Sequence, residues 1–390
     1  MNKVTQSVID SLTTNKAGMV LSLYMPTHKI STPDTAKEDR VRYRNILGKG
    51  FEEWQEKLGA DAVDTTRDIR TQLEAKIEDA DFWSETYKGL AIFIQPDGFE
   101  VLHLPIECDE YTYVGESFDL APLHIVMSME QPYYVLALAK HNPKLFYGDM
   151  YTLEPVEMDF PASPEDALNI DEMFSGSDTV RGVPTGRGSN DMFSTHGQGD
   201  TNHAGQEEHF SYLRILDNKI LKSDVVDRNT PLLVAATDSE VSDFKHVSNH
   251  PHLLQCYVQG NHEDTPLHEL HDLSWSKITE EIVDNRVAAL LDRFNENKGR
   301  QKASSDISEV IDATISGRVD TLLLGIVEKT NDSVSDAGEK EAPLIRLQKE
   351  YQLNRMCELT QQVIAQGGTI VGVDPELLGT PTMIGACYRY

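Results

Sequence analysis

The stretch Tyr133-Tyr134-Val135-Leu136-Ala137-Leu138-Ala139 decides how the chain is divided. Its unbroken run of apolar and aromatic residues is typical of a strand buried on both faces. Residues 144–147 and 153–158 follow at short intervals, and they predict the next two strands of a meander. Because an earlier α/β pattern ends near Pro122, we expect a new domain to begin at about residue 129.

The segment on the N-terminal side has its own α/β pattern. Residues 19–25 predict a strand, and residues 36–59 and 62–80 predict two helices. Residues 89–94 and 99–104 predict the two strands of a hairpin. The apolar face expected on the first of these helices consists of Val41, Ile46, Leu47, Phe51, Trp54 and Leu58.

A long segment without periodicity follows the meander. Residues 171–206 are rich in Gly, Ser, Thr, Asn and Asp, which predicts a long loop. Residues 175–206 contain seven glycines, so little burial would offset the entropy cost of ordering them, and we expect this part to be mobile. A helix is expected over 207–222, followed by a strand at 231–236 and a short helix at 238–247. The expected apolar face of the first helix is Phe210, Leu213, Leu216 and Ile220.

A third α/β segment is expected from about Pro266. Helical spacing runs on to about residue 297, and residues 319–325 predict a buried strand. Residues 344–366 predict another helix. The alternation of helices with short apolar strands predicts a layered α/β domain. We therefore expect a mixed α/β (α+β) chain with three domains, at 1–128, 129–265 and 266–390.

Charge and composition limit the partners of the chain. The 390 residues have a formal net charge of −29, so the mean electrostatic field repels nucleic acids and anionic membranes. Contact with RNA must therefore come from local basic clusters, and we expect no DNA partner. The four cysteines show no CxxC spacing, which fits a reducing compartment. Because no run approaches the ~20 apolar residues of a membrane span and no signal peptide is recognisable, we expect a cytoplasmic protein.

A glutamine between two glycines marks the candidate functional loop. It lies in the stretch Thr195-His196-Gly197-Gln198-Gly199, just before the helix expected over 207–222. Gly197 and Gly199 allow backbone N–H groups to approach a ligand closely. The amide of Gln198 can position a water molecule. The alternative is a surface loop whose glycines serve only to form turns.

Basic residues lie in this loop and on the helix behind it. Arg181 and Arg187 are in the loop, and Arg214, Lys219 and Lys222 are on the helix. Because phosphate contacts are made mainly by such side chains, these five are candidate RNA contacts. The alternative is that they form ordinary surface salt bridges.

No motif for a metal or a nucleotide is found. His246 and His250 are four residues apart and further histidines follow, but no HExxH or His–carboxylate spacing specifies a metal geometry. The chain contains no P-loop, no strand-borne GxGxxG and no GxSxG elbow. We therefore expect neither a metal nor a cofactor.

Four segments, taken in order, resemble one known family. They are Leu21-Ser22-Leu23-Tyr24-Met25-Pro26-Thr27-His28, the segment from Val135 to Gly148, Val319-Asp320-Thr321-Leu322-Leu323-Leu324, and Gly385-Ala386-Cys387-Tyr388-Arg389-Tyr390. Together they resemble the archaeo-eukaryotic class-1 peptide-chain release factors and Pelota, through their bacterial, Balon-like relatives. The resemblance spans nearly the whole chain. It implies a ribonuclease-H-like central domain and a shape that occupies a tRNA-like site on the ribosome.

The resemblance is incomplete at the motifs that define release factors. In that family a Gly-Gly-Gln tip enters the peptidyl-transferase centre and helps water to hydrolyse peptidyl-tRNA. The matching place here is the stretch from His196 to Gly199, which lacks the double glycine, and Ala204-Gly205-Gln206 is a second match. Neither Asn-Ile-Lys-Ser nor Tyr-x-Cys-x-x-x-Phe occurs in the first 130 residues, so stop-codon reading is not implied.

The resemblance therefore implies a ribosome-associated translation factor that acts in rescue or hibernation. Ribosomal RNA is its expected partner, and a translational GTPase is a candidate partner. Whether the chain hydrolyses peptidyl-tRNA stays open. One alternative is a hydrolase with an acid–histidine site near His196 and His203, in the region 196–209. Another is a protein-interaction module that keeps the fold but not the ribosome, which the acidic composition favours.

Overall fold

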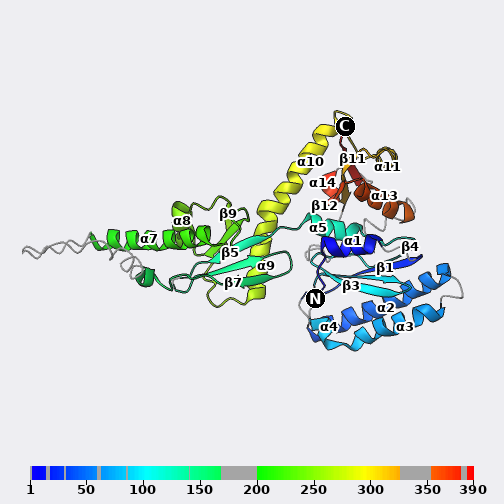
Figure 1. Cartoon of the computed structure of the whole chain (residues 1–390), viewed down its shortest axis with the longest axis horizontal. Helices are drawn as coiled ribbons and strands as arrows, with labels where there is room; N and C mark the ends of the chain where they lie inside the picture. The colour runs from blue at the N-terminus through cyan, green and yellow to red at the C-terminus, as the bar shows by residue number, and fades with distance from the viewer. Residues whose placement is uncertain are drawn as a thin grey trace, which may run out of the picture. The chain divides into compact units, whose positions relative to one another are not determined.

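The described residues of the computed structural model form a mixed α/β structure with three separate sheets (Figure 1). This confirms the predicted fold class. The chain divides into two compact units: Met1–Glu130 together with Arg286–Tyr390, and Gln131–Asn285. The described residues are 2–14, 18–29, 32–58, 63–84, 87–139, 141–167, 200–325, 353–378 and 384–390.

The first sheet is antiparallel and has the order β3-β2-β1-β4. Its central strand β1 (Val20–Pro26) and the hairpin of β2 (Gly89–Gln95) and β3 (Gly98–Leu104) confirm the predictions. The edge strand β4 (Tyr111–Gly115) was not predicted, because it is short and lies between loops that show no period.

Helix α2 (Pro33–Leu58) covers this sheet, accompanied by α3 (Val63–Ala75). The predicted face is correct from Ile46 to Trp54, where the apolar side chains are at most 2% exposed. Val41 was wrongly included, since it is 45% exposed. Position 41 is five residues before Ile46 and therefore lies off the inward stripe, which Tyr43 continues instead. The smaller helices of this part are α1 (Gln6–Thr14), a 3₁₀ turn (Lys76–Glu78), α4 (Ala80–Ser84) and α5 (Ala121–Ser128).

The central sheet has the order β7-β6-β5-β8-β9. Strands β5 (Tyr133–Ala137), β6 (Lys144–Gly148) and β7 (Leu153–Val156) form the predicted antiparallel meander. Strands β8 (Leu232–Ala236) and β9 (Leu253–Gln259) continue from β5 in parallel. A meander extended by parallel strands on its first member is the ribonuclease-H-like arrangement that the resemblance implied.

Helices cover both faces of the central sheet. On one face Leu136 of β5 packs in a cluster with side chains of α7 (Asp200–Lys222) and α8 (Asp238–Val247). On the other face Val135 packs in a cluster with α9 (Leu267–Ile278). Because both faces are covered, the whole of β5 is apolar. Helix α7 begins at Asp200, so the prediction that residues 200–206 belong to the loop was wrong.

The chain leaves α9 without a break. A π-helical turn (Thr279–Val283) joins it to α10 (Asp284–Lys298). Helix α9, which was predicted to open the third domain, packs on the central sheet through Leu270 and Ile278. The three-domain division stays a prediction.

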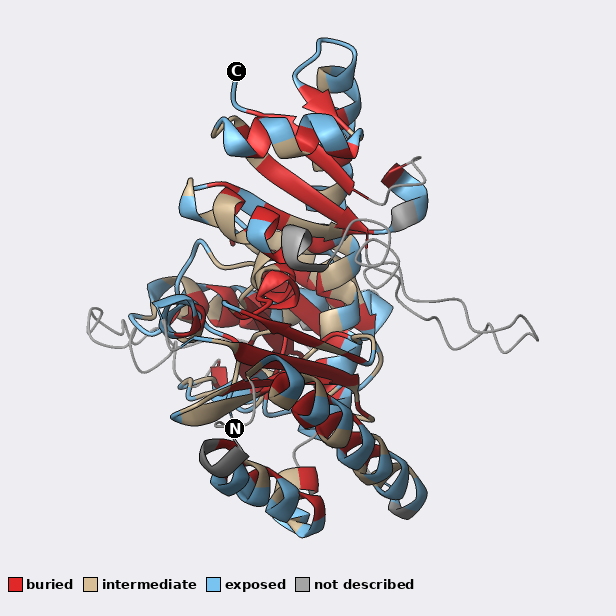
Figure 2. Cartoon of the chain, turned by 90° about the vertical axis from the view of Figure 1, so that its right-hand side faces the viewer, coloured by how far each residue is buried: buried red, intermediate tan, exposed pale blue. Residues whose placement is uncertain are grey.

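The third sheet has the order β10-β13-β11-β12. Strands β11 (Val319–Gly325) and β12 (Thr369–Val373) are parallel, while β13 (Ile384–Tyr388) runs antiparallel to β11 and to the short β10 (Ala303–Ser304). Helices α10, α11 (Ile307–Ile315), α13 (Leu353–Ala365) and α14 (Pro375–Leu378) accompany it. Strand β13 and nearly all of β11 are buried, whereas β12 is only partly buried, and Figure 2 colours the strands accordingly. In the part of the chain that the structure describes, no helix could span a membrane.

Candidate functional site

The predicted loop residues lie outside the described part of the chain. This holds for the tip residues and for the two loop arginines: His196, Gly197, Gln198, Gly199, Arg181 and Arg187. The expected mobility of residues 175–199 lies outside it as well. The structure does describe α7, the helix that follows the loop, and shows how this helix is held against the central sheet.

Helix α7 is fixed to the central unit by a continuous apolar face. Leu213, Leu216 and Ile220 are at most 2% exposed and pack with Leu136 of β5 and Phe244 of α8. Their spacing of three and four residues places them on one side of the helix, as predicted. Three large buried side chains contribute several kcal/mol of hydrophobic stabilisation, at roughly 2 kcal/mol each. The inner two-thirds of α7 is therefore part of the core.

A buried carboxylate on α7 adds a directional contact. Asp217 is 1% exposed, and its carboxylate accepts hydrogen bonds from the Ser248 hydroxyl at 2.6 Å and from the Asn249 backbone N–H at 2.8 Å. Ser248 directly follows α8 as its C-cap residue. A buried carboxylate is tolerated only where donors compensate its lost hydration. The pair of donors therefore fixes the rotation of α7 against the end of α8.

The opposite flank of α7 is tied to the segment that follows β7. The Tyr212 hydroxyl donates to the Pro161 carbonyl oxygen at 3.2 Å, and Lys219 Nζ lies 3.1 Å from Asp159 Oδ2. Burial, with a smaller contribution from the Asp166 carboxylate, raises the pKa of Tyr212 to about 12. The phenol is therefore protonated at neutral pH and keeps its donor role.

The anchoring contacts extend along α7 as far as His209, the tenth residue of the helix. His209 Nε2 lies 3.4 Å from Asp243 Oδ2 of α8, with each side chain about one-third exposed. The ring of Phe210 lies 5.6 Å from that of His246. Further out, Glu208, Glu207 and Gln206 are exposed. His203 lies within α7, and His196 of the hydrolase alternative lies outside the described residues.

The predicted basic residues of α7 differ in their surroundings. Lys219 is engaged by Asp159. Arg214 and Lys222 are exposed, and among the described residues neither forms an ion pair. Arg214 lines a hollow of about 470 Å³ on the outer side of the helix. The other residues that line this hollow are Gln206, Glu207, Phe210 and Ser211.

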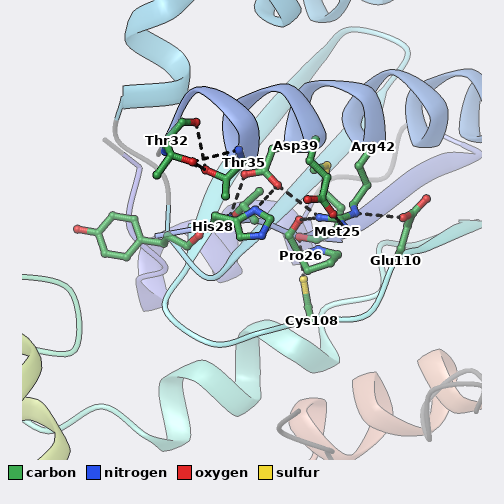
Figure 3. A network of polar contacts seen from close by, with 12 residues as sticks. Met25, Pro26, His28, Thr32, Thr35, Asp39, Arg42, Cys108 and Glu110 are labelled. Carbon is green, nitrogen blue, oxygen red and sulfur yellow. Dashed lines mark hydrogen bonds and ion pairs between the residues drawn. The ribbon is translucent and has the colours of Figure 1, made fainter. Parts of the chain in front are cut away.

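A second polar network lies where β1 leads into α2 (Figure 3). The Asp39 side chain is 3% exposed and accepts from the His28 backbone N–H at 3.0 Å, while His28 Nδ1 lies 2.9 Å from Asp39 Oδ1. Arg42 reaches Asp39 at 3.3 Å, Glu38 at 2.9 Å and Glu110 at 3.6 Å. One guanidinium thus contacts three carboxylates. We interpret the network as a clamp between strand and helix, which the sequence analysis had missed because its members are spread over 82 positions, from His28 to Glu110.

A third buried acid lies behind the first sheet. Asp119 is 3% exposed, and its carboxylate accepts from the Tyr111 hydroxyl at 2.8 Å and from the Ala121 N–H at 3.2 Å. Burial raises the pKa of Asp119, and these two hydrogen bonds oppose that rise. Its own backbone carbonyl accepts from the Tyr24 hydroxyl at 2.6 Å. These contacts join β1, β4 and α5 into one framework.

The histidines considered as metal ligands contact aromatic and buried polar residues. Searching the described ranges for three or more His, Cys, Asp or Glu placed around an ion yields no group. His246 contacts Phe210, and His250 is buried next to the base of α7. Burial lowers the pKa of His250, with a smaller lowering by His252 and an opposing effect of Asp217.

The central unit is also the part of the chain that matches a family model. Residues 132–318 match the model described as Bacterial archaeo-eukaryotic release factor family 3. The match covers slightly less than half of the 390-residue chain. The match includes all five strands of the central sheet and α7, and it confirms the family that the resemblance indicated.

Solved structures of archaeal proteins are similar at low sequence identity. Pelota of Archaeoglobus fulgidus is 13% identical, with 77% of this chain and 79% of that chain covered and a TM-score of 0.34. The archaeal translation termination factor aRF1 is also 13% identical, with 98% and 96% covered and a TM-score of 0.24. A model of ribosome-bound archaeal Pelota and ABCE1 contains a chain that is 10% identical, with 100% and 95% covered and a TM-score of 0.35. Curated proteins yield no match.

Proposed function

We propose that the chain is a ribosome-associated translation factor of the release-factor type. The observation that carries this proposal is the family match over residues 132–318, which contains α7 together with the sheet that anchors it. The geometry supports it, since α7 is fixed along its inner part and exposed at Gln206 and Glu207. A helix held in this way can present the loop before it to a distant site.

We assign the tip of this loop to Gln198, with Gly197 and Gly199 providing backbone freedom and His196 beside them. Arg181, Arg187, Arg214 and Lys222 are proposed RNA contacts, whereas Lys219 serves the structure through its pair with Asp159. Because phosphate binding depends on unpaired cations near the surface, Arg214 and Lys222 fit this role better than Lys219.

The proposed role is rescue or hibernation rather than stop-codon termination. The support is the absence of both stop-codon motifs and of the double glycine before Gln198. The proposed partners are ribosomal RNA and a translational GTPase, and the proposed compartment is the cytoplasm. We expect little hydrolysis of peptidyl-tRNA, because only one glycine precedes the glutamine.

Co-sedimentation with ribosomes tests the proposal. The chain should pellet with ribosomes at low salt, and the bound fraction should fall as salt rises, because phosphate contacts release counterions. A variant with Arg214→Gln and Lys222→Gln should bind less. A control with Lys37→Gln and Lys49→Gln, two exposed lysines of α2, should bind as the wild type does. No pelleting at low salt would refute the proposal.

A release assay on ribosomes that hold peptidyl-tRNA tests the chemistry separately. We expect release close to background for the wild type and for Gln198→Ala, with ribosome binding retained in both. Strong wild-type release that Gln198→Ala abolishes would instead show that the chain is an enzyme and that Gln198 positions the attacking water.

A further inference from the structure

One end of the third sheet brings three basic residues together. Lys302 immediately precedes β10, Arg318 precedes β11 and Arg389 follows β13. Two backbone hydrogen bonds fix their order: Tyr388 N–H donates to the Lys302 carbonyl at 2.8 Å, and Arg389 N–H donates to the Arg318 carbonyl at 2.9 Å. Lys302 therefore lies opposite Tyr388, and Arg389 lies opposite Arg318. Because neighbouring strands lie about 4.8 Å apart, the three cations share one end of the sheet on three adjacent strands, and they are here called the sheet-end row.

The charges of the sheet-end row are not used in ion pairs. Lys302 and Arg389 are exposed and Arg318 is half-buried. Within the described residues none of the three pairs with a carboxylate, whereas nearby Arg293 does so with Asp320 at 3.0 Å. Arg389 donates instead to the Gln366 carbonyl oxygen, at 2.7 Å.

Two acidic side chains that influence Tyr388 electrostatically, Asp306 and Glu309, have hydrogen-bond partners of their own. The Asp306 carboxylate accepts from the first backbone N–H groups of α11, at 2.9 Å from Ser308 and 3.1 Å from Glu309. The Glu309 carboxylate accepts from the Ser304 hydroxyl. Both acids therefore accept hydrogen bonds from β10 or the start of α11, and among the described residues neither forms an ion pair with a cation of the row.

The turn before Lys302 adds a further cation and an unusual backbone conformation. In the segment Lys298-Gly299-Arg300-Gln301-Lys302, Gln301 has a φ of 58°, a left-handed conformation that residues other than glycine rarely adopt. Backbone N–H groups of Arg300 and Lys302 both donate to the Asn297 carbonyl, at 3.0 and 2.9 Å. Arg300 is exposed next to the row. The turn thus holds two cations close together at the surface.

Aromatic side chains accompany these cations. The Arg318 guanidinium lies over the Tyr388 ring, 5.3 Å from its centroid. Tyr390 is 68% exposed and follows Arg389 directly, at the end of the buried strand β13 (Figure 2). Basic residues beside an exposed ring are the combination that binds a nucleic-acid backbone and stacks on a base.

We propose that the sheet-end row is an RNA-binding surface, in which Lys302, Arg318 and Arg389 contact phosphates and Tyr390 stacks on a base. An RNA backbone fits better than an acidic protein, because a line of cations matches a line of phosphates and because a ring is provided for stacking. This surface belongs to a different unit from α7. It does not depend on the proposed role of the loop.

The test is fluorescence anisotropy of a short fluorescein-labelled single-stranded RNA titrated with the full chain. The variant Lys302→Gln/Arg318→Gln/Arg389→Gln should bind at least about tenfold more weakly at low salt, and the slope of log affinity against log salt should fall by about 2 for three lost contacts. Lys302→Gln alone should give a smaller loss, and Lys302→Arg should restore binding. Thermal unfolding of each variant shows whether it is folded.

The matched control is Lys37→Gln/Lys49→Gln/Arg67→Gln, which removes the same charge from exposed positions of α2 and α3. It should bind RNA within about twofold of the wild type. Equal losses in both triple variants, or no loss in the sheet-end variant, would overturn the proposal. So would a wild type that binds a labelled polyglutamate peptide but not the RNA. Ribosome pelleting without RNA binding at this surface would refute this proposal and leave the proposed function intact.

Discussion

Asp217 of the central unit and Asp119 of the other unit are both almost completely buried, at 1% and 3% exposure, but they do different things. Asp217 connects two helices, since its donors come from the end of α8. Asp119 connects strand β4 to the start of helix α5, and burial raises its pKa. Asp217 thus anchors α7 to the end of α8, whereas Asp119 is a buried acid whose pKa is raised by burial.

Two kinds of contact differ in how strictly they set the orientation of α7. Hydrophobic packing of Leu216 and Ile220 would tolerate small rotations of α7, but two hydrogen bonds to one carboxylate would not. We infer that Asp217 fixes the direction in which α7 carries the preceding loop. Asp119 does not orient a functional element in this way, because its partners all belong to the first sheet and α5.

The largest expected effect is that of Asp217→Ala. The substitution leaves the half-buried Ser248 hydroxyl and the N–H of the exposed Asn249 without their acceptor, which should lower the free energy of unfolding by about 2 kcal/mol, at about 1 kcal/mol for each hydrogen bond. Urea unfolding measures it. Asp224→Ala, at an exposed position just beyond α7, is the matched control and should cost less than about 0.5 kcal/mol. Equal effects of the two substitutions would remove Asp217 as an anchor.

A smaller and pH-dependent effect is expected for Asp119→Asn. Because the folded-state pKa of Asp119 is raised, the folded wild type binds a proton that the unfolded chain has lost, and its stability falls as pH rises from the ordinary carboxyl pKa of 3.8 through the raised value. The asparagine variant lacks this loss. It should be less stable than the wild type by about 1 kcal/mol at low pH, through the weakened Tyr111 hydrogen bond.

The measurement is urea unfolding of both proteins across this pH range. The stability difference between wild type and Asp119→Asn should shrink as pH rises. A difference that stays constant, or that grows with pH, would show that burial does not raise the pKa of Asp119 in the folded protein.

The smallest effect is expected at the surface of α7. Lys219→Gln removes the ion pair with Asp159, which is fully exposed, so the change in stability should be below about 1 kcal/mol. The same substitution should leave RNA binding unchanged, unlike Arg214→Gln. If Lys219→Gln instead weakens ribosome binding as strongly as Arg214→Gln, the distinction between paired and unpaired cations on α7 fails.

Much of the fold could be predicted because its strands are buried on both faces. The apolar runs that begin at Tyr133 and Val319 are typical of buried strands, and both form strands in the structure. Helix α8 was predicted with the same bounds as in the structure. The start of α7 was missed for the opposite reason. Residues 200–206 include Thr201, Asn202 and Gly205, which have low helix propensity and show no apolar period.

The candidate site was predictable only in part. The basic residues of α7 are visible as charges in a helical segment, and Arg214 and Lys222 are indeed exposed. The role of Asp217 was not predictable, because its partners follow 31 and 32 residues later and a lone acid in a helix usually faces solvent. The sheet-end row was missed likewise, since Lys302, Arg318 and Arg389 become neighbours only through strand pairing.

The most direct test of the central claim is site-specific photocrosslinking to ribosomes. A photoreactive residue at Gln206, on the exposed part of α7, should crosslink to ribosomal RNA, whereas one at Asp97, in the exposed turn between β2 and β3, serves as the comparison position. The account predicts RNA crosslinks from position 206 that exceed those from position 97 and disappear when ribosome binding is competed by unlabelled protein. Crosslinks from position 206 that are absent, or that persist under competition, would contradict it.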